Sequence, residues 1–167
     1  QQRALWNALH EAGSGLGMRP IGMRAQGSLR LEKGYGVWSL EFTASVTPAM
    51  SGLDRYVAFD KGEFIGRDAA LRDREAGPAQ RLVLLAVDAR DADMTGYEPV
   101  HCDGRRVGYV TSGAYGHHVR QSLALAYVER AIADAPAALS VNVVGELCPA
   151  RILPKPPYDP SGVRLRG

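Results

Sequence analysis

The spacing of hydrophobic residues is helical at the start of the chain. Leu5, Ala8, Leu9 and Ala12 recur at the three- and four-residue spacing of one helix face. Three glycines within residues 13–17 then interrupt the pattern, as glycines do at helix C-termini. The pattern predicts a first helix of about twelve residues.

The segment up to residue 78 predicts further short elements. Residues 22–33 are less regular, but most of them are good helix formers, so we expect a second helix there. Gly34 and Gly36 end it, and Pro48 and Gly52 mark a loop. The remaining expectations are a short strand at residues 55–59, a helix at residues 67–75 and a boundary at residues 77–78.

Beyond this boundary the hydrophobic period changes from helical to extended. Residues 81–87 (RLVLLAV) are almost continuously apolar, which is typical of a buried strand. Asp103-Gly104 lies between extended segments and favours a tight hairpin turn. Further strands are expected at residues 122–128, 139–144 and 148–153, with a turn at 144–147. Short strands with regular turns predict a small antiparallel barrel or sandwich, followed by an extended, proline-rich surface tail at residues 154–167.

Composition narrows the class of protein. A hydrophobic content of 46% is sufficient for a packed core. Twenty basic and eighteen acidic residues nearly balance, and the arginines are scattered, so nucleic acid is not an expected partner. No run of eighteen apolar residues and no signal segment occur, so we expect no membrane association and a cytoplasmic protein, or a mitochondrial-matrix protein if eukaryotic.

Two further features concern completeness and redox chemistry. The chain opens on Gln1 within a helical pattern, from which we expect a fragment of a longer protein. Cys102 and Cys148 each lack a nearby Cys or His at metal-ligand spacing. We expect two buried free thiols rather than a zinc site or a disulfide framework.

Five segments together resemble one known family. They agree with it in order and spacing over nearly the whole chain. The segments are GMRAQGSLRLEKGYGVW (residues 22–38), TPAMSGLDRYVAFDKGEFIGRDAALRD (47–73), EPVHCDGRRVGYVTSGAYG (98–116), LALAYV (123–128) and YDPSGVRLRG (158–167). The family is the glycine-cleavage T-protein, or aminomethyltransferase, superfamily. The LEKGY wording and the YDP…RLRG ending are most similar to the dimethylglycine and sarcosine dehydrogenase or oxidase branch.

This resemblance implies an α+β fold and a folate-dependent function. Residues 1–78 would be the end of a mixed α/β folate-binding domain, and residues 79–167 a small antiparallel β-barrel with an extended tail. The expected cofactor is tetrahydrofolate, which receives a one-carbon unit derived from an N-methyl amine. FAD would be bound only by an upstream domain of the same polypeptide. The family's catalytic Asp and main pterin-binding Glu would also lie upstream, so we expect no catalytic residue here and no activity from the chain alone.

Two candidate folate-binding residues lie near the second predicted helix. Tyr35 follows the helix-ending Gly34, where an aromatic ring can project into a cleft and stack on a pterin or benzoyl ring, although it could also be an ordinary half-buried tyrosine. Arg24, near the helix start, could pair with a glutamate carboxylate of folate or simply be solvated.

Two more candidates are Glu32 and Tyr158. Glu32 could accept a hydrogen bond from a pterin amine, but bracing of Arg30 and nearby backbone is favoured. Tyr158 lies in the proline-stiffened tail and could be held over a ligand channel, or could anchor the tail to the barrel.

Other functions receive less support from the sequence. His117-His118 would face opposite sides of a strand and has no suitable acidic or cysteine companions, so no metal site is expected. Neither a phosphate-binding glycine loop nor a nucleophile elbow is present. A non-catalytic folate-binding regulatory protein, such as a tRNA-modification factor, would carry a cysteine in a K-G-C-Y-x-G-Q-E element, whereas residues 61–67 read KGEFIGR. A purely structural module remains a further alternative.

Overall fold

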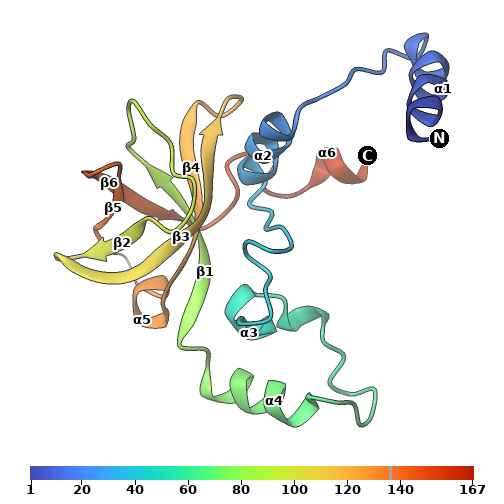
Figure 1. Ribbon diagram of the computed structural model, residues 1–167. Helices are drawn as coiled ribbons and strands as arrows, with labels where there is room; N and C mark the ends of the chain where they lie inside the picture. The colour runs from blue at the N-terminus through green and yellow to red at the C-terminus, as the bar shows by residue number, and fades with distance from the viewer. Residues whose placement is uncertain (136) are drawn as a thin grey trace.

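The computed structural model describes residues 1–135 and 137–167 and contains a mainly helical N-terminal part and a β-barrel. The first helix, α1 (Gln2–Ser14), confirms the helix predicted at the start of the chain. In Figure 1 it stands apart from the rest of the molecule, at the end of an extended connection. Its apolar face, which includes Leu5, Trp6 and Leu9, is exposed.

Four short elements follow α1 before the barrel begins: α2 (Met23–Glu32), α3 (Pro48–Ser51), the 3-10 helix η1 (Asp54–Tyr56) and α4 (Arg67–Ala76). Helices α2 and α4 confirm the predictions for these regions. Helix α3 lies where a loop was expected. Thr47 explains its start, because the side chain accepts a hydrogen bond from the Met50 amide while Pro48 occupies the first turn.

The predicted strand at residues 55–59 is wrong. Leu53 begins a helical turn, in which the Tyr56 amide donates to the Leu53 carbonyl and the Val57 amide donates to the Asp54 carbonyl. A strand needs a neighbouring strand for its backbone hydrogen bonds, and this segment pairs with none. A run of five residues (RYVAF) was therefore too short to determine its structure.

Six antiparallel strands form a closed barrel (Figure 1). The order around it is β1-β4-β3-β2-β5-β6, and β6 pairs with β1 to close the sheet. This arrangement confirms the expected α+β class and decides between the barrel and the sandwich. The strands are β1 (Gln80–Val87), β2 (Pro99–Cys102), β3 (Arg105–Gly116), β4 (Gln121–Glu129), β5 (Leu139–Val143) and β6 (Glu146–Leu153), with the short helix α5 (Arg130–Ala133) after β4.

The barrel has one hydrophobic cluster inside and a second outside. Leu85 and Val87 of β1 belong to the interior cluster, which fills the barrel. Leu84 and Ala86 point the other way and pack with Leu31 of α2. Strand β1 is therefore buried on both faces, which explains its almost continuous apolar run.

Three smaller expectations need correction. The tail is not entirely extended, because Gly162, at φ +68°, begins the short helix α6 (Val163–Arg166). His117 and His118 lie in the turn between β3 and β4 rather than on a strand, because the chain reverses there. Cys148 is buried, but Cys102 is partly exposed because it ends β2 beside a turn.

Two kinds of feature are absent from the described residues. Across residues 1–135 and 137–167, no helix has the length and apolar character needed to cross a membrane. The same residues contain no cluster of three or more His, Cys, Asp and Glu side chains suited to a metal ion.

Candidate functional site

Tyr35 lines a pocket between the helical part and the outside of the barrel. The pocket has a volume of about 530 Å³ and takes its floor from β1, β4 and β6. Its lining includes Tyr35, Phe42, Arg55, Tyr56, Leu84 and Lys155. Its mixture of aromatic, aliphatic and basic groups is typical of a site for a flat ligand that carries negative charge.

Local backbone geometry explains how Tyr35 reaches this pocket. Gly34 has φ +65° and ends α2, and the Tyr35 amide donates to the Arg30 carbonyl at 2.8 Å. The side chain is 49% exposed, so it is not a core residue. Lys33 places its Nζ 5.8 Å from the ring centroid. The side chain is thus accessible to a ligand in the pocket.

A second aromatic ring and a cation lie in the same pocket. Arg55 lies over the Tyr56 ring, with its Cζ 4.8 Å from the ring centroid, and also donates to the Tyr56 hydroxyl at 3.2 Å. Both residues are exposed. Sequence reasoning missed them because nothing along the chain shows that a segment twenty residues after Tyr35 folds back beside it.

Glu32 lies outside this pocket. It is fully buried, and its carboxylate accepts hydrogen bonds from the backbone amides of His118, at 2.8 Å, and Val119, at 3.4 Å. Two of its acceptor positions are therefore used to hold the turn between β3 and β4 against α2. Glu32 thus braces backbone that is distant in the sequence, whereas Arg30, which it was expected to brace, pairs with Glu41. The folate contact of Glu32 stays a prediction.

Tyr158 lies against a different part of the surface. Its amide donates to the Glu32 carbonyl at 3.1 Å, and its ring packs edge-on against His118 at 4.8 Å between centroids. The Arg164 guanidinium donates to its hydroxyl at 3.3 Å. Glu32 and Tyr158 are thus brought together, but they do not share the pocket of Tyr35.

The tail is held by an ion pair beside Tyr158. Lys33 Nζ lies 3.1 Å from a carboxylate oxygen of Asp159 and 2.7 Å from its carbonyl oxygen. Desolvation acts to raise the pKa of the Asp159 carboxyl, but hydrogen bonds from Lys33 and from the Arg164 and Val163 amides, together with the Lys33 charge, lower it overall.

Replacing Asp159 with asparagine is expected to lower the melting temperature by a few degrees at neutral pH. The lowered pKa means that the carboxylate stabilises the folded state above its ordinary pKa of 3.8 and loses this effect as the pH falls through the lower folded value. The difference between wild type and Asp159→Asn should therefore shrink in melts below about pH 3.8. Asp91→Asn, at an exposed loop position, is the control. A difference independent of pH would contradict this role.

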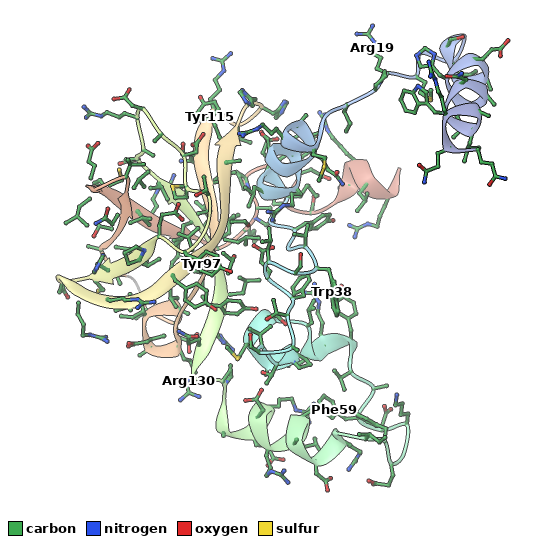
Figure 2. All side chains as sticks on the ribbon, in the orientation of Figure 1. Arg19, Trp38, Phe59, Tyr97, Tyr115 and Arg130 are labelled. Carbon is green, nitrogen blue, oxygen red and sulfur yellow. The ribbon has the colours of Figure 1, made fainter. Side chains whose placement is uncertain are left out.

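Arg24 is exposed in the first turn of α2 and does not line the pocket of Tyr35. Trp38 is also exposed, and Figure 2 shows it projecting from the segment between α2 and α3, away from the barrel. The structure thus places one of the four predicted site residues, Tyr35, in this pocket.

A buried polar cluster lies behind the pocket, centred on Glu41. One carboxylate oxygen accepts from the hydroxyls of Thr111, at 2.6 Å, and Ser112, at 2.5 Å, both on β3. The other accepts from the Val37 amide at 2.8 Å and lies 3.4 Å from the Arg30 guanidinium. Glu41 is completely buried, and sequence reasoning missed it because its two hydroxyl partners on β3 are 70 and 71 residues away.

Burial affects the ionisation of two neighbours of Glu41. It lowers the pKa of Arg30, although the Glu41 charge acts in the opposite direction. The Tyr127 hydroxyl donates to the Glu41 carbonyl at 2.9 Å, and burial, helped by Tyr109 and Glu41, raises the pKa of Tyr127 to about 12. Tyr127 is therefore a neutral donor at physiological pH.

Comparison with known proteins gives two family matches. Residues 1–61 match the family described as the GCVT N-terminal domain, and residues 80–159 match the glycine cleavage T-protein C-terminal barrel domain. The crystal structure of the glycine cleavage system aminomethyltransferase T from Bartonella henselae superposes with a TM-score of 0.82 at 25% identity, over 95% of this chain and 44% of that chain.

Curated relatives include aminomethyltransferases and longer enzymes that are named as an oxidase and a dehydrogenase. The aminomethyltransferase of Frankia alni is 37% identical over 96% of this chain and 44% of its own length. The 4-methylaminobutanoate oxidase (formaldehyde-forming) of Paenarthrobacter nicotinovorans is 38% identical over 96% of this chain and 20% of its own. The human mitochondrial dimethylglycine dehydrogenase is 34% identical over 92% and 18%, respectively. The chain thus spans less than half the length of each of these relatives.

Proposed function

Because the chain belongs to the glycine cleavage T-protein family, we propose that it is the C-terminal, tetrahydrofolate-binding part of an enzyme that transfers one-carbon units from N-methyl amines. The dimethylglycine and sarcosine dehydrogenase or oxidase branch is the proposed subfamily. The LEKGY and RLRG motifs support this subfamily, as do relatives named as a dimethylglycine dehydrogenase and a 4-methylaminobutanoate oxidase.

The observation that carries this proposal is the pocket of Tyr35. Its volume of about 530 Å³ falls within the range of small-molecule and cofactor sites. A pterin or benzoyl ring would stack on the half-exposed Tyr35 ring, and Arg55 or Lys155 would pair with a glutamate carboxylate of the cofactor. The residues present therefore fit tetrahydrofolate, which supplies the acceptor nitrogen for the one-carbon unit when bound.

The division of labour in the longer protein is part of the proposal. Residues 1–78 would complete a folate domain, residues 79–167 would form its barrel partner, and FAD would be bound by an upstream domain that oxidises the amine. The chain alone would bind folate without turnover, since the carboxylate needed for acid-base chemistry is expected upstream. Arg24, Glu32 and Tyr158 stay predicted folate contacts.

Replacing Tyr35 with alanine is expected to weaken tetrahydrofolate binding by the 167-residue chain about three- to tenfold. The reason is the loss of one stacking surface, which is worth on the order of 1 kcal/mol. Titration calorimetry under anaerobic conditions measures the dissociation constant, and a thermal melt of the same sample measures stability. Because Tyr35 is 49% exposed, the melting temperature should change little.

Two variants control this experiment. Tyr35→Phe keeps the ring and should keep wild-type affinity. Tyr115→Ala removes a tyrosine of β3 that lies outside the pocket and should leave binding unchanged (Figure 2). An unchanged dissociation constant for Tyr35→Ala beside a clearly lower melting temperature would mean that Tyr35 only supports the fold.

A further inference from the structure

The pocket of Tyr35 is connected to the barrel by a short path of polar contacts. The Arg30 guanidinium nitrogen that lies 3.4 Å from Glu41 also donates to the Tyr35 carbonyl at 3.1 Å. The Tyr35 amide returns a hydrogen bond to the Arg30 carbonyl. The backbone of Tyr35 is therefore held on both sides by Arg30, and Arg30 is held by Glu41.

Glu41 also fixes the segment that follows Tyr35. Its carboxylate accepts from the Val37 amide, and a Cβ at Gly36 would lie only 2.9 Å from the Glu41 Cβ and 2.7 Å from a ring carbon of Phe42. Glycine at position 36 thus permits a close approach that a larger residue would prevent. The turn from Tyr35 to Phe42, both of which line the pocket, is built around this one carboxylate.

On the barrel side, Glu41 contacts strand β3 at a β-bulge. The pairing of β3 with β4 shifts register between Val110 and Ser112. Neighbouring residues of a regular strand point to opposite faces, but a bulge can turn both toward one side. As a result the hydroxyls of Thr111 and Ser112 both donate to the same oxygen of Glu41.

We propose that Glu41 is a positioning residue of the Tyr35 pocket, through which the bulge in β3 sets the place of the Tyr35 ring. This inference rests on the proposed folate-binding function. Glu41 does not line the pocket itself, so its effect on a ligand passes through Arg30 and Tyr35. A buried carboxylate with four polar partners has one low-energy arrangement, which makes it a rigid link between the two parts of the chain.

A double-mutant cycle tests the link. We expect Glu41→Gln to raise the dissociation constant for tetrahydrofolate about three- to tenfold in the otherwise wild-type chain. In the Tyr35→Ala background the same change should have no further effect on affinity, because the ring that it misplaces is already gone. A merely structural Glu41 would change affinity by the same factor in both backgrounds, and that result would overturn the proposal.

A variant on the barrel side gives an independent test if Glu41→Gln folds poorly. Thr111→Val keeps the carboxylate and removes one hydroxyl on β3, outside the pocket. We expect about a two- to fivefold loss of affinity that also disappears in the Tyr35→Ala background. Glu129→Gln is the matched control, since that carboxylate pairs with Arg105 on the barrel surface and should not affect binding.

The measurements distinguish a wrong role for Glu41 from a wrong folate-binding function. If Tyr35→Ala leaves the dissociation constant unchanged, the folate role of Tyr35 is wrong. Amide hydrogen exchange then tests the positioning role of Glu41 without any ligand. Faster exchange of the Val37 and Tyr35 amides in Glu41→Gln supports this role, and unchanged exchange rates overturn it.

Discussion

Replacing Gly108 with alanine is expected to destabilise the barrel by about 3 kcal/mol or more. Gly108 lies on β3 opposite Val128 of β4. A Cβ there would lie 2.2 Å from the Tyr127 carbonyl oxygen and 2.9 Å from the Val128 Cα, which are both backbone atoms. These backbone atoms cannot move aside unless β3 and β4 separate. Even one methyl group therefore breaks the hydrogen-bonded pairing of the two strands at this position.

Chemical denaturation followed by circular dichroism measures this effect. Gly27→Ala is the matched control, because Gly27 lies within α2 and a Cβ there meets nothing within 4 Å. Alanine should stabilise that helix by about 0.5–1 kcal/mol. Equal stability of Gly108→Ala and wild type would show that β3 and β4 can part at this point without cost.

Leu31→Ala is expected to lower the free energy of unfolding by about 2–5 kcal/mol. Leu31 is 1% exposed and is the one contribution of α2 to the outer cluster, where it packs with Leu84, Leu123 and Leu125 among the described residues. Its removal leaves a cavity between α2 and the barrel. Leu31 is not part of the interior cluster that fills the barrel, so the six strands should remain paired in the variant.

Leu29 supplies the comparison on the same helix. It is 52% exposed, and Leu29→Ala should change stability by no more than about 0.5 kcal/mol. Urea denaturation of both variants, followed by far-ultraviolet circular dichroism, measures the difference. A small loss for Leu31→Ala would mean that α2 is held mainly by its polar contacts with β3 and the tail.

The barrel was more predictable from the sequence than the helical part was. Its strands have near-continuous apolar runs because β1 and β4 are buried on both faces, and Asp103-Gly104 occupies the turn between β2 and β3 with positive φ at both residues. Residues 55–59 carry no comparable pattern. Their short helical turn follows from local hydrogen bonds that no hydrophobic period records.

The candidate site was predicted only in part. Tyr35 was found because it follows a glycine that ends a helix, which is a local feature. Glu41, Arg55 and Tyr56 were missed because their importance depends on residues that the fold brings together from distant positions, such as Glu41 with Thr111 and Ser112. The proposed domain division at residues 78–79 stays a prediction.

Closure of the barrel also has a consequence for the order of folding. Strands β3 and β4 are joined by a short turn, as are β5 and β6, so these hairpins can form as soon as they are synthesised. The closing pair joins β1 to β6, at Leu84 and Leu153, and cannot form until the other four strands have been synthesised. Because the pocket of Tyr35 takes its floor from β1, β4 and β6, the helical segment before the barrel acquires its binding geometry only after the strands that follow it have closed the barrel.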